Sequence, residues 1–286
     1  MSKKAIMQES WTSGMNPLSF CAFDFDAIEK PTKALVHQAA RFMYFNKGIG
    51  KIKIDGVEYD ILPHTLCAIT PWKVTDIIDV RDTLHLNLIV YDFQFFNTAL
   101  KFTPGLEEES VTLINFLQAH PLIHLEGEQV QTIDEIMSAF QKELGVDSAS
   151  LGQSNRPFNF LYTLVKIIEI MIEYRRCFQE SKESVGKKSN SGMQNSILSY
   201  IYFHSAEHLT LEKVAEVFYI SESSLSKKLT DLTGTTFTKL LNDIRIEKAS
   251  DYLIYTGLTL EEIALLLCFS DASHLSKHFV EKLGLT

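Results

Sequence analysis

The sequence predicts an α+β chain. An N-terminal antiparallel β-barrel with accompanying helices precedes a C-terminal domain made only of helices. Three observations lead to this fold class. Apolar and polar residues alternate through much of residues 35–95, which is typical of strands. Residues 128–180 change to the 3.6-residue period of amphipathic helices. A helical segment after residue 193 then occurs twice, about fifty residues apart.

The composition is that of a globular protein and argues against several classes. Of the 286 residues, 45% are hydrophobic and 22% are charged, and the net charge of −9 argues against coating nucleic acid by bulk charge. No apolar run reaches the ~18 residues of a membrane span, and the N-terminus lacks the apolar core of a secretory signal. We therefore expect a cytoplasmic protein. The cysteines form no CxxC pair, which predicts reduced thiols and no zinc site: Cys21, Cys67, Cys177 and Cys268.

Turn residues divide residues 35–95 into several short strands. The segment KIKIDGVEY predicts a hairpin whose turn is Asp55-Gly56. The segment TLHLNLIVYDF predicts a strand with two distinct faces. One face holds Leu84, Leu86, Leu88 and Val90, and the other holds His85, Asn87, Ile89 and Tyr91. Short strands in series predict a small antiparallel barrel or sandwich.

Two amphipathic helices follow. The stripe of the first is Val130, Ile133, Met137, Phe140 and Leu144. The stripe of the second is wide and apolar: Leu161, Leu164, Ile168 and Ile172. So apolar a helix needs a large partner, either the barrel or a second copy of the chain. We expect a homodimer formed through residues 156–180.

One clear linker divides the chain. Residues 181–192, SKESVGKKSNSG, are rich in Ser, Lys and Gly. The predicted domains are therefore residues 1–180 and residues 193–286. Residues 11–20, WTSGMNPLSF, are either an arm over the barrel or a plain first strand.

The C-terminal domain contains an internal repeat. LTLEKVAEVFYIS at 209–221 aligns with LTLEEIALLLCFS at 258–270, and the segments LSK align again after one inserted residue. In each copy a threonine caps a short helix, and we expect Ser221 and Ser270 to cap the helix that follows. This pattern predicts two helix-turn-helix units, joined by a long helix that ends near Gly257.

The second helix of each unit has the character needed to enter a DNA groove. Such a helix must be polar on one side and must donate hydrogen bonds to base edges and phosphates. The candidate DNA-binding residues are Ser223, Ser224, Ser226 and Lys227 in the first unit, and Ala272, Ser273, Ser276 and Lys277 in the second. A stiff helix between the units would hold two reading helices for neighbouring turns of one groove, ~34 Å apart.

At these residues the chain resembles the AraC/XylS family of bacterial transcription regulators. The matching pattern runs through LTLEKVA, ISESSLSKKL, IRIEKA, LTLEEIA and FSDASHLSKHF. The resemblance implies that residues 193–286 bind double-stranded DNA. It also implies a cupin-like barrel that regulates this domain, with dimerisation helices. The chain departs from the family in stopping at Thr286, where members continue with a further short segment.

The charge of the C-terminal domain keeps a second hypothesis open. Residues 193–286 hold eight Lys or Arg against twelve Asp or Glu, a net charge of −4. Attraction to phosphate by bulk charge is therefore weak, and DNA binding would be modest and sensitive to salt. The alternative is a protein-binding module, or anti-regulator, that has lost DNA contact.

The barrel offers candidate residues for a small-molecule effector: Arg41, Phe42, Tyr44, Trp72, His85, Asn87 and Tyr91. Arg41 could anchor a carboxylate through charge-assisted hydrogen bonds. The resemblance implies a sugar or a fatty acid, and the aromatic, weakly charged set favours the apolar acid. His274 and His278 have i, i+4 spacing, but no further ligand is evident, so we expect no metal site and no cofactor. No catalytic motif occurs. A metal-binding cupin enzyme needs a cluster of histidines, whereas His37, His64 and His85 are each isolated in the sequence.

These observations together predict a transcription regulator and not an enzyme. We expect this regulator to be an activator. Its barrel senses an effector, and its two helix-turn-helix units read a promoter site. RNA polymerase is a further candidate partner. A third hypothesis, besides the regulator and the protein-binding module, is a cupin enzyme, which would require a bound metal ion.

Overall fold

The computed structural model describes residues 6–7, 21–93, 96, 107–144, 157–180 and 197–283. The chain divides into two compact units, one within residues 6–192 and the other comprising residues 193–286 with a short N-terminal segment. The predicted linker, 181–192, and the segment 11–20 lie outside the described residues. In the described residues, no helix combines the length and the apolar character that crossing a membrane requires.

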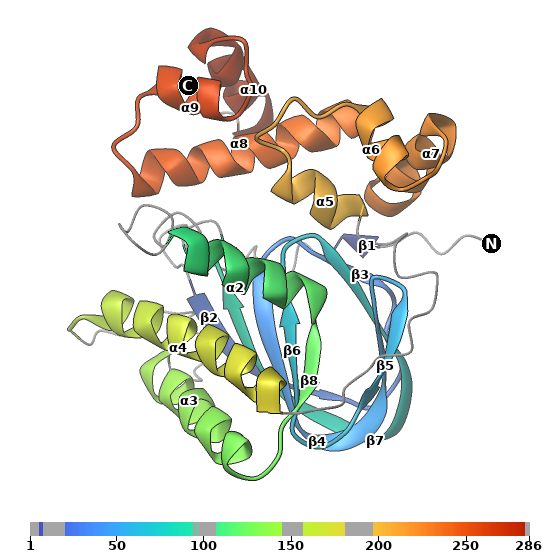
Figure 1. Cartoon of the computed structure of the whole chain (residues 1–286), viewed down its shortest axis with the longest axis vertical. Coiled ribbons are helices and arrows are strands. Elements are labelled where there is room, and N and C mark those ends of the chain that lie inside the picture. The colour runs from blue at the N-terminus through green and yellow to red at the C-terminus, as the bar shows by residue number, and fades with distance from the viewer. Residues whose placement is uncertain are drawn as a thin grey trace. The chain divides into compact units, whose positions relative to one another are not determined.

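The N-terminal unit is a curled, mostly antiparallel sheet covered on one side by helices (Figure 1). Its elements in chain order are β1 (Ile6–Met7), β2 (Cys21–Ile28), β3 (Leu35–His37), β4 (Ala40–Ile54), β5 (Val57–Ile61), β6 (Thr65–Ile69), β7 (Lys73–Tyr91), α2 (Glu107–Ala119), β8 (Leu122–His124), α3 (Glu128–Leu144) and α4 (Asn159–Glu180). This architecture confirms the predicted fold class. The strand β2, with its alternating apolar residues, and the helix α2 were not predicted.

Two long strands shape the barrel. β4 and β7 pair along their whole length, while β6 and β5 pair with successive parts of β4, and β3 and β2 with successive parts of β7. The β4–β7 ladder has register shifts near Lys47 and Gly50, and such bulges bend a sheet. Gly48, at φ 100°, and Gly50 approach the β7 backbone so closely that a Cβ would lie 2.4 Å from a carbonyl oxygen. Only glycine fits this bend.

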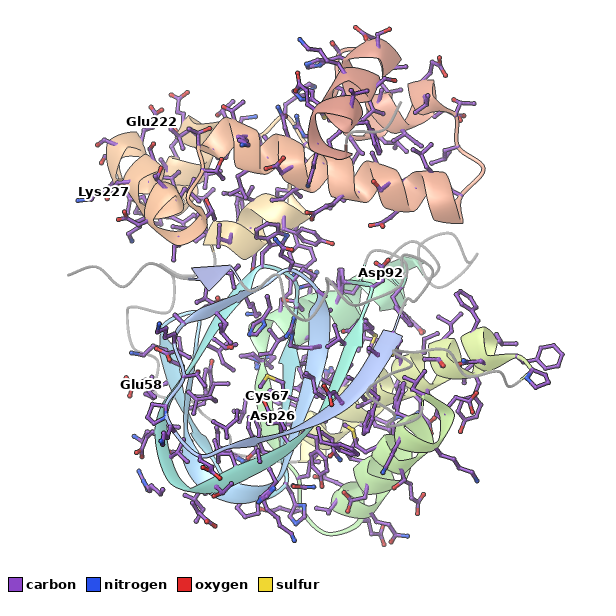
Figure 2. All side chains as sticks on the ribbon, turned by 180° about the vertical axis from the view of Figure 1, so that it is seen from behind. Asp26, Glu58, Cys67, Asp92, Glu222 and Lys227 are labelled. Atoms are coloured by element: carbon purple, nitrogen blue, oxygen red, sulfur yellow. The ribbon has the colours of Figure 1, made fainter. Side chains whose placement is uncertain are left out.

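The barrel interior is an apolar core. Alternate residues of the strands form it, among them Met43 and Phe45 of β4. Cys67 of β6 belongs to the same core and is labelled in Figure 2. The predicted face of β7 is confirmed, because all four of its residues belong to this core: Leu84, Leu86, Leu88 and Val90.

The predicted β4–β5 hairpin is confirmed, and a buried ion pair anchors it. Asp55 (φ 47°) and Gly56 (φ 84°) both have positive φ, as a type I′ turn requires. Nζ of Lys73 lies 3.1 Å from Oδ2 of Asp55, and both side chains are buried. Burial raises the pKa of the Asp55 carboxyl, and the Lys73 charge partly offsets this rise. The turn is thus tied to the start of β7.

Helices cover the opposite face of the sheet. Phe42 stacks on Tyr91, with ring centroids 5.6 Å apart, and both lie on the side where α4 contributes the buried Tyr174. α4 turns its buried side toward this layer through Ile167, Ile170, Met171 and Tyr174. Of the apolar stripe predicted for this helix, Leu161 and Ile172 are exposed and Leu164 and Ile168 are half-buried.

The C-terminal unit is entirely helical in its described residues. Its helices are α5 (Ile197–Phe203), α6 (Leu211–Val217), α7 (Glu222–Thr233), α8 (Phe237–Tyr255), α9 (Leu260–Leu266) and α10 (Ala272–Leu283). α8 is the predicted long helix. It contacts α7 as well as α9 and α10, so the two helix pairs share it as a brace (Figure 1).

Candidate DNA-binding surface

The first helix pair, α6 and α7, forms as its caps predict. Thr210 caps α6 by accepting a hydrogen bond from Lys213 N–H at 3.2 Å. Ser221 caps α7 by accepting from Ser224 N–H at 3.3 Å. Leu225 and Leu229 are fully buried. The pair therefore buries one face of α7 and leaves the other in solvent.

The second pair, α9 and α10, begins with the predicted capping box. Thr259 N–H donates to Oε2 of Glu262 at 2.7 Å, and Glu262 N–H donates to Oγ1 of Thr259 at 3.3 Å. Leu275 of α10 is fully buried, as Leu225 is in the first pair. The turn of each pair contains one residue with positive φ, Tyr219 at 53° and Cys268 at 56°.

The cap of α10 differs from the prediction. Asp271, rather than Ser270, accepts the hydrogen bond from His274 N–H, at 2.7 Å to Oδ1. Ser270 donates its hydroxyl to the other carboxylate oxygen of Asp271. The residue inserted in the second copy moves the helix start by one position, so a carboxylate takes the cap. The bond from His274 N–H holds the pKa of Asp271 below its usual range, and the Ser270 hydroxyl adds to this.

The structure puts the predicted DNA-binding residues on the outer sides of α7 and α10. Five are exposed: Ser223, Ser224, Lys227, Ser273 and Lys277. Three are half-buried: Ser226, Ala272 and Ser276. Figure 2 shows Lys227 and Glu222 on α7, directed to solvent.

The hydroxyls and amines of these residues differ in their freedom to bind DNA. Ser276 donates its hydroxyl to the carbonyl of Ala272 at 2.8 Å, and the Ser223 hydroxyl lies 3.1 Å from that of Ser221. Within the described residues, neither Lys227 nor Lys277 has a hydrogen-bond or ion-pair partner. Among the predicted DNA-binding residues, the two lysines are therefore the side chains best placed to contact phosphates or base edges.

Several basic residues of the C-terminal unit form contacts within the unit instead. Arg245 of α8 is buried and donates to the carbonyls of Ser205 at 2.7 Å and Glu207 at 2.9 Å. Lys248 is also buried and donates to the carbonyl of Tyr202 at 2.7 Å. Lys282 lies 3.1 Å from the Glu247 carboxylate. The positive charge that can reach DNA is therefore smaller than the count of eight Lys and Arg indicates.

The effector candidates do not gather on one face of the sheet. Arg41 shares a strand face with the interior residues Met43 and Phe45, and it is buried at 6% exposure. Phe42 and Tyr44 alternate with them and face the other way. Tyr91 stacks on Phe42, and Tyr44 donates or accepts a hydrogen bond with His64 Nδ1 at 2.9 Å.

The remaining candidates divide in the same way. His85 is exposed and Asn87 is half-buried on the outer face of β7, whereas Trp72 is buried. A surface hollow of about 480 Å³ lies along residues 127–138 of the α3 region, and no effector candidate lines it.

Arg41 is the candidate with the most unusual surroundings. Its Nε has no hydrogen-bond partner within the described residues, and its Nη2 makes only a long bond, 3.4 Å, to the carbonyl of Ala39. Thr70 Oγ1 and Trp72 Nε1 are likewise buried without partners. Both follow Ile69, the residue that pairs with Arg41 in register. Burial lowers the pKa of Arg41 to about 10, so it remains charged at neutral pH.

Comparison with known proteins adds to this geometry. A family model described as a helix-turn-helix domain matches residues 214–286. An uncharacterised HTH-type transcriptional regulator of Staphylococcus aureus is 35% identical over 116 residues, which are 41% of this chain and 15% of that protein. The HTH-type transcriptional activator RhaS of an Enterobacter species is 33% identical over 94 residues, 33% of this chain and 34% of that protein.

Among solved structures, the C-terminal domain of AraT, a response regulator from Geobacillus stearothermophilus, is 33% identical. The match covers 33% of this chain and 78% of that one, with a TM-score of 0.31. This chain spans less than two thirds of the length of the curated relatives it matches. The residues that the family model matches include α7 to α10, whose turns and buried leucines follow the repeated pattern described above. Residues 214–286 therefore form a helix-turn-helix domain, and this chain is similar over part of its length to HTH-type transcriptional regulators.

Proposed function

We propose that the protein is a sequence-specific, DNA-binding transcription regulator of the bacterial cytoplasm. The observation that carries this proposal is the pair of second helices, α7 and α10, each with an exposed lysine and at least one exposed serine and both packed on α8. α8 has 19 residues and is therefore about 28 Å long. A brace of this length suits two reading helices in neighbouring turns of a groove, ~34 Å apart.

In this proposal the contacts to DNA come from exposed side chains of both helix-turn-helix units. Lys227 and Lys277 donate to phosphates or to base edges, and Ser223, Ser224 and Ser273 supply short polar contacts. The net charge of −4 on residues 193–286 gives little long-range attraction to DNA, so affinity depends on these local contacts. We expect modest affinity with marked salt sensitivity, and no catalytic activity.

We assign the protein as an activator, with RNA polymerase as a further partner. The name of the RhaS relative, a transcriptional activator, supports this direction of regulation. A reporter gene placed behind the bound promoter tests it. Expression that rises with the protein supports activation, and expression that falls contradicts it.

We also propose that two copies of the chain associate through α4. Its outward residues Leu161, Val165 and Ile172 recur at i, i+4 and i+11 and are 55%, 52% and 37% exposed. An apolar stripe of this kind on a helix is suited to a matching stripe in an isologous dimer. Dimerisation would place four reading helices on one DNA and compensate for the weak charge of each copy.

We propose that the effector is an organic acid with an apolar body, bound at Arg41. A buried guanidinium without a carboxylate partner is costly, and a ligand carboxylate would relieve that cost through charge-assisted hydrogen bonds. Thr70 Oγ1 and Trp72 Nε1, near the same end of the strands, are further donors that have no partner among the described residues. Ligand binding would then shift the population of states that differ in DNA affinity.

Calorimetric titration separates the two effector classes. A fatty acid and a sugar are titrated into the full chain, beside the variant Arg41→Met and the control Arg81→Met on the exposed part of β7. Heat from the fatty acid alone, lost in Arg41→Met and kept in Arg81→Met, is the expected result. Unchanged binding in Arg41→Met removes Arg41 from the site.

The acidic C-terminal unit also supports a second candidate, a protein-binding module that has lost DNA contact. Genome-wide DNA pull-down with the full chain distinguishes the two. Recovery of a discrete set of fragments, bound again in gel shifts at low salt, supports the regulator. Absence of any specific shift at every salt concentration favours the module.

A further inference from the structure

Two histidines of α10 meet across one helical turn. Nε2 of His278 lies 3.1 Å from Nε2 of His274, and the ring centroids are 4.7 Å apart. The buried Phe269 packs near both imidazoles, with centroid distances of 5.7 Å to His274 and 6.0 Å to His278. The pair therefore rests on an apolar support at the helix surface.

The separation of the two nitrogens matches that of two ligands on one metal ion. Zn–N bonds are about 2.0–2.1 Å, so two imidazole nitrogens in tetrahedral coordination lie about 3.3 Å apart. Two histidines at i and i+4 on one helix face are a recurrent ligand pair. Replacing the hydrogen bond between the rings by an ion thus requires only a small adjustment.

Glu281 adds a second feature of metal sites. Its Oε2 lies 3.1 Å from Nδ1 of His278, the nitrogen opposite the one that meets His274. A carboxylate there favours the proton on Nδ1 and leaves the lone pair on Nε2. Metal-binding histidines commonly have such a partner, which sets the tautomer and the ring orientation.

We propose that His274 and His278 form a two-histidine site for a divalent transition-metal ion such as Zn²⁺, Ni²⁺ or Cu²⁺, with Glu281 as the positioning residue of His278. Imidazole selects these ions over Mg²⁺ and Ca²⁺, which prefer oxygen ligands. In the part of the chain that the structure describes, no group of three or more His, Cys, Asp or Glu side chains could hold a metal ion. Water therefore fills the other coordination positions, and the ion exchanges readily.

Occupancy would change the helix that we propose to read DNA. The ion adds two positive charges next to Lys277, in a unit whose net charge is −4. Chelation across one turn also stabilises the helical form of α10. Higher DNA affinity in the presence of the ion follows, and this coupling rests on the proposed function, whereas metal binding does not.

Calorimetric titration of nickel chloride into the full chain, in a mildly alkaline buffer without chelators, tests the site. The variants are His274→Gln and His278→Gln, and the control is His204→Gln, another histidine paired with a carboxylate three residues away. We expect the α10 variants to bind nickel at least about tenfold more weakly and the control to match the wild type. Magnesium chloride should give no binding.

Glu281→Gln separates positioning from ligation, because it keeps both ligands and should weaken nickel binding by up to about tenfold. Equal nickel affinity in the wild type and in both histidine variants, with circular dichroism showing all of them folded, would overturn the site. Gel shifts with and without nickel then test the coupling. Nickel binding without any change in DNA affinity would overturn the coupling alone, and no DNA binding under any condition would count against the proposed function.

Discussion

Asp271 caps helix α10 at the position where Ser221 caps helix α7. Each accepts a hydrogen bond from the backbone N–H three residues later, but Ser221 is neutral and Asp271 carries a carboxylate. The carboxylate that matches the positive end of the α10 dipole is therefore the cap itself, whereas in α7 it is Glu222, the first residue after a neutral cap. The two units, although repeats in sequence, do not present the same electrostatic surface to DNA.

Replacing Asp271 by Asn should raise DNA affinity about two- to fivefold, because the cap is kept while a charge that repels phosphate is removed. Fluorescence anisotropy with a recovered genomic fragment at low salt measures this. Asp60→Asn on β5 makes the same change of net charge outside the helix-turn-helix units. An equal gain in both variants would mean that only net charge matters.

Replacing Lys227 or Lys277 by Ala should lower DNA affinity and flatten its salt dependence. Each lysine that neutralises one phosphate contributes about 0.9 to the slope of log affinity against log salt concentration. Anisotropy titrations at several salt concentrations provide the slope. Lys142→Ala on α3 removes an exposed lysine from the N-terminal unit, and it should leave the slope unchanged. Parallel lines for all variants would exclude direct phosphate contact.

Replacing Val165 by Glu should dissociate the proposed dimer without unfolding the chain. The side chain is half exposed, so the monomer tolerates a charge there, whereas a dimer interface would bury it. We expect the dimer dissociation constant, measured by analytical ultracentrifugation, to rise at least about tenfold. Leu62→Glu changes a similarly exposed residue before β6 and serves as the control. A dimer that persists in Val165→Glu contradicts association through this stripe.

Replacing Lys73 by Met should destabilise the N-terminal unit strongly, because Asp55 would remain buried without its partner. A loss of about 3–5 kcal/mol in the free energy of unfolding is expected. The exposed pair Lys53–Glu58, 3.3 Å apart, is the comparison, and Lys53→Met should cost less than about 1 kcal/mol. Urea denaturation followed by tryptophan fluorescence reports on this unit, since Trp11 and Trp72 both precede the linker. Similar losses in the two variants would argue against the buried pair as the anchor.

The N-terminal unit should lose stability as the pH falls below about 6.5. Burial, together with the charge of Arg41, holds the pKa of His37 well below its usual 6.5. Below that pH the unfolded chain therefore binds a proton at His37, whereas the folded chain keeps the imidazole neutral. The stability that this group contributes is complete above the unfolded pKa and declines on acidification, by up to about 1.4 kcal/mol per pH unit. His37→Gln, whose amide can still bond Thr75, should show a flatter dependence between pH 7 and 5 in the same urea assay. Identical pH profiles would remove His37 as the cause.

Particular residues show which features of the structure could be predicted from the sequence. The alternation at Leu84–Val90 and the Asp55-Gly56 turn were read correctly, because both depend on local periodicity and backbone preference. The sequence predicts Ser270 as the cap of α10, whereas Asp271 takes that role, because the repeat alone does not show on which side of the inserted residue the helix begins. The net charge of −4 includes Arg245 and Lys248, but the sequence does not show that they are buried, because the carbonyls that they bind lie about forty residues earlier in the chain.

The effector candidates illustrate the same limit. Alternation alone separates Arg41 from Phe42 and Tyr44, but which face is the barrel interior depends on where α3 and α4 pack. The sequence likewise does not show which side of α4 is exposed, because its apolar stripe is wide and its buried side depends on the layer it packs against.

The order of neighbouring residues is enough to predict the fold class, the β4–β5 hairpin, the inner face of β7 and the repeated helix pairs. Only the tertiary structure decided which side chains are free to bind something. It buries Arg41 with no partner for Nε among the described residues, ties the buried Arg245 and Lys248 to backbone carbonyls, and brings the His274 and His278 rings together beside Phe269. Burial and partnership depend on residues distant in the chain, and these set the cost of a charge and its availability to a ligand.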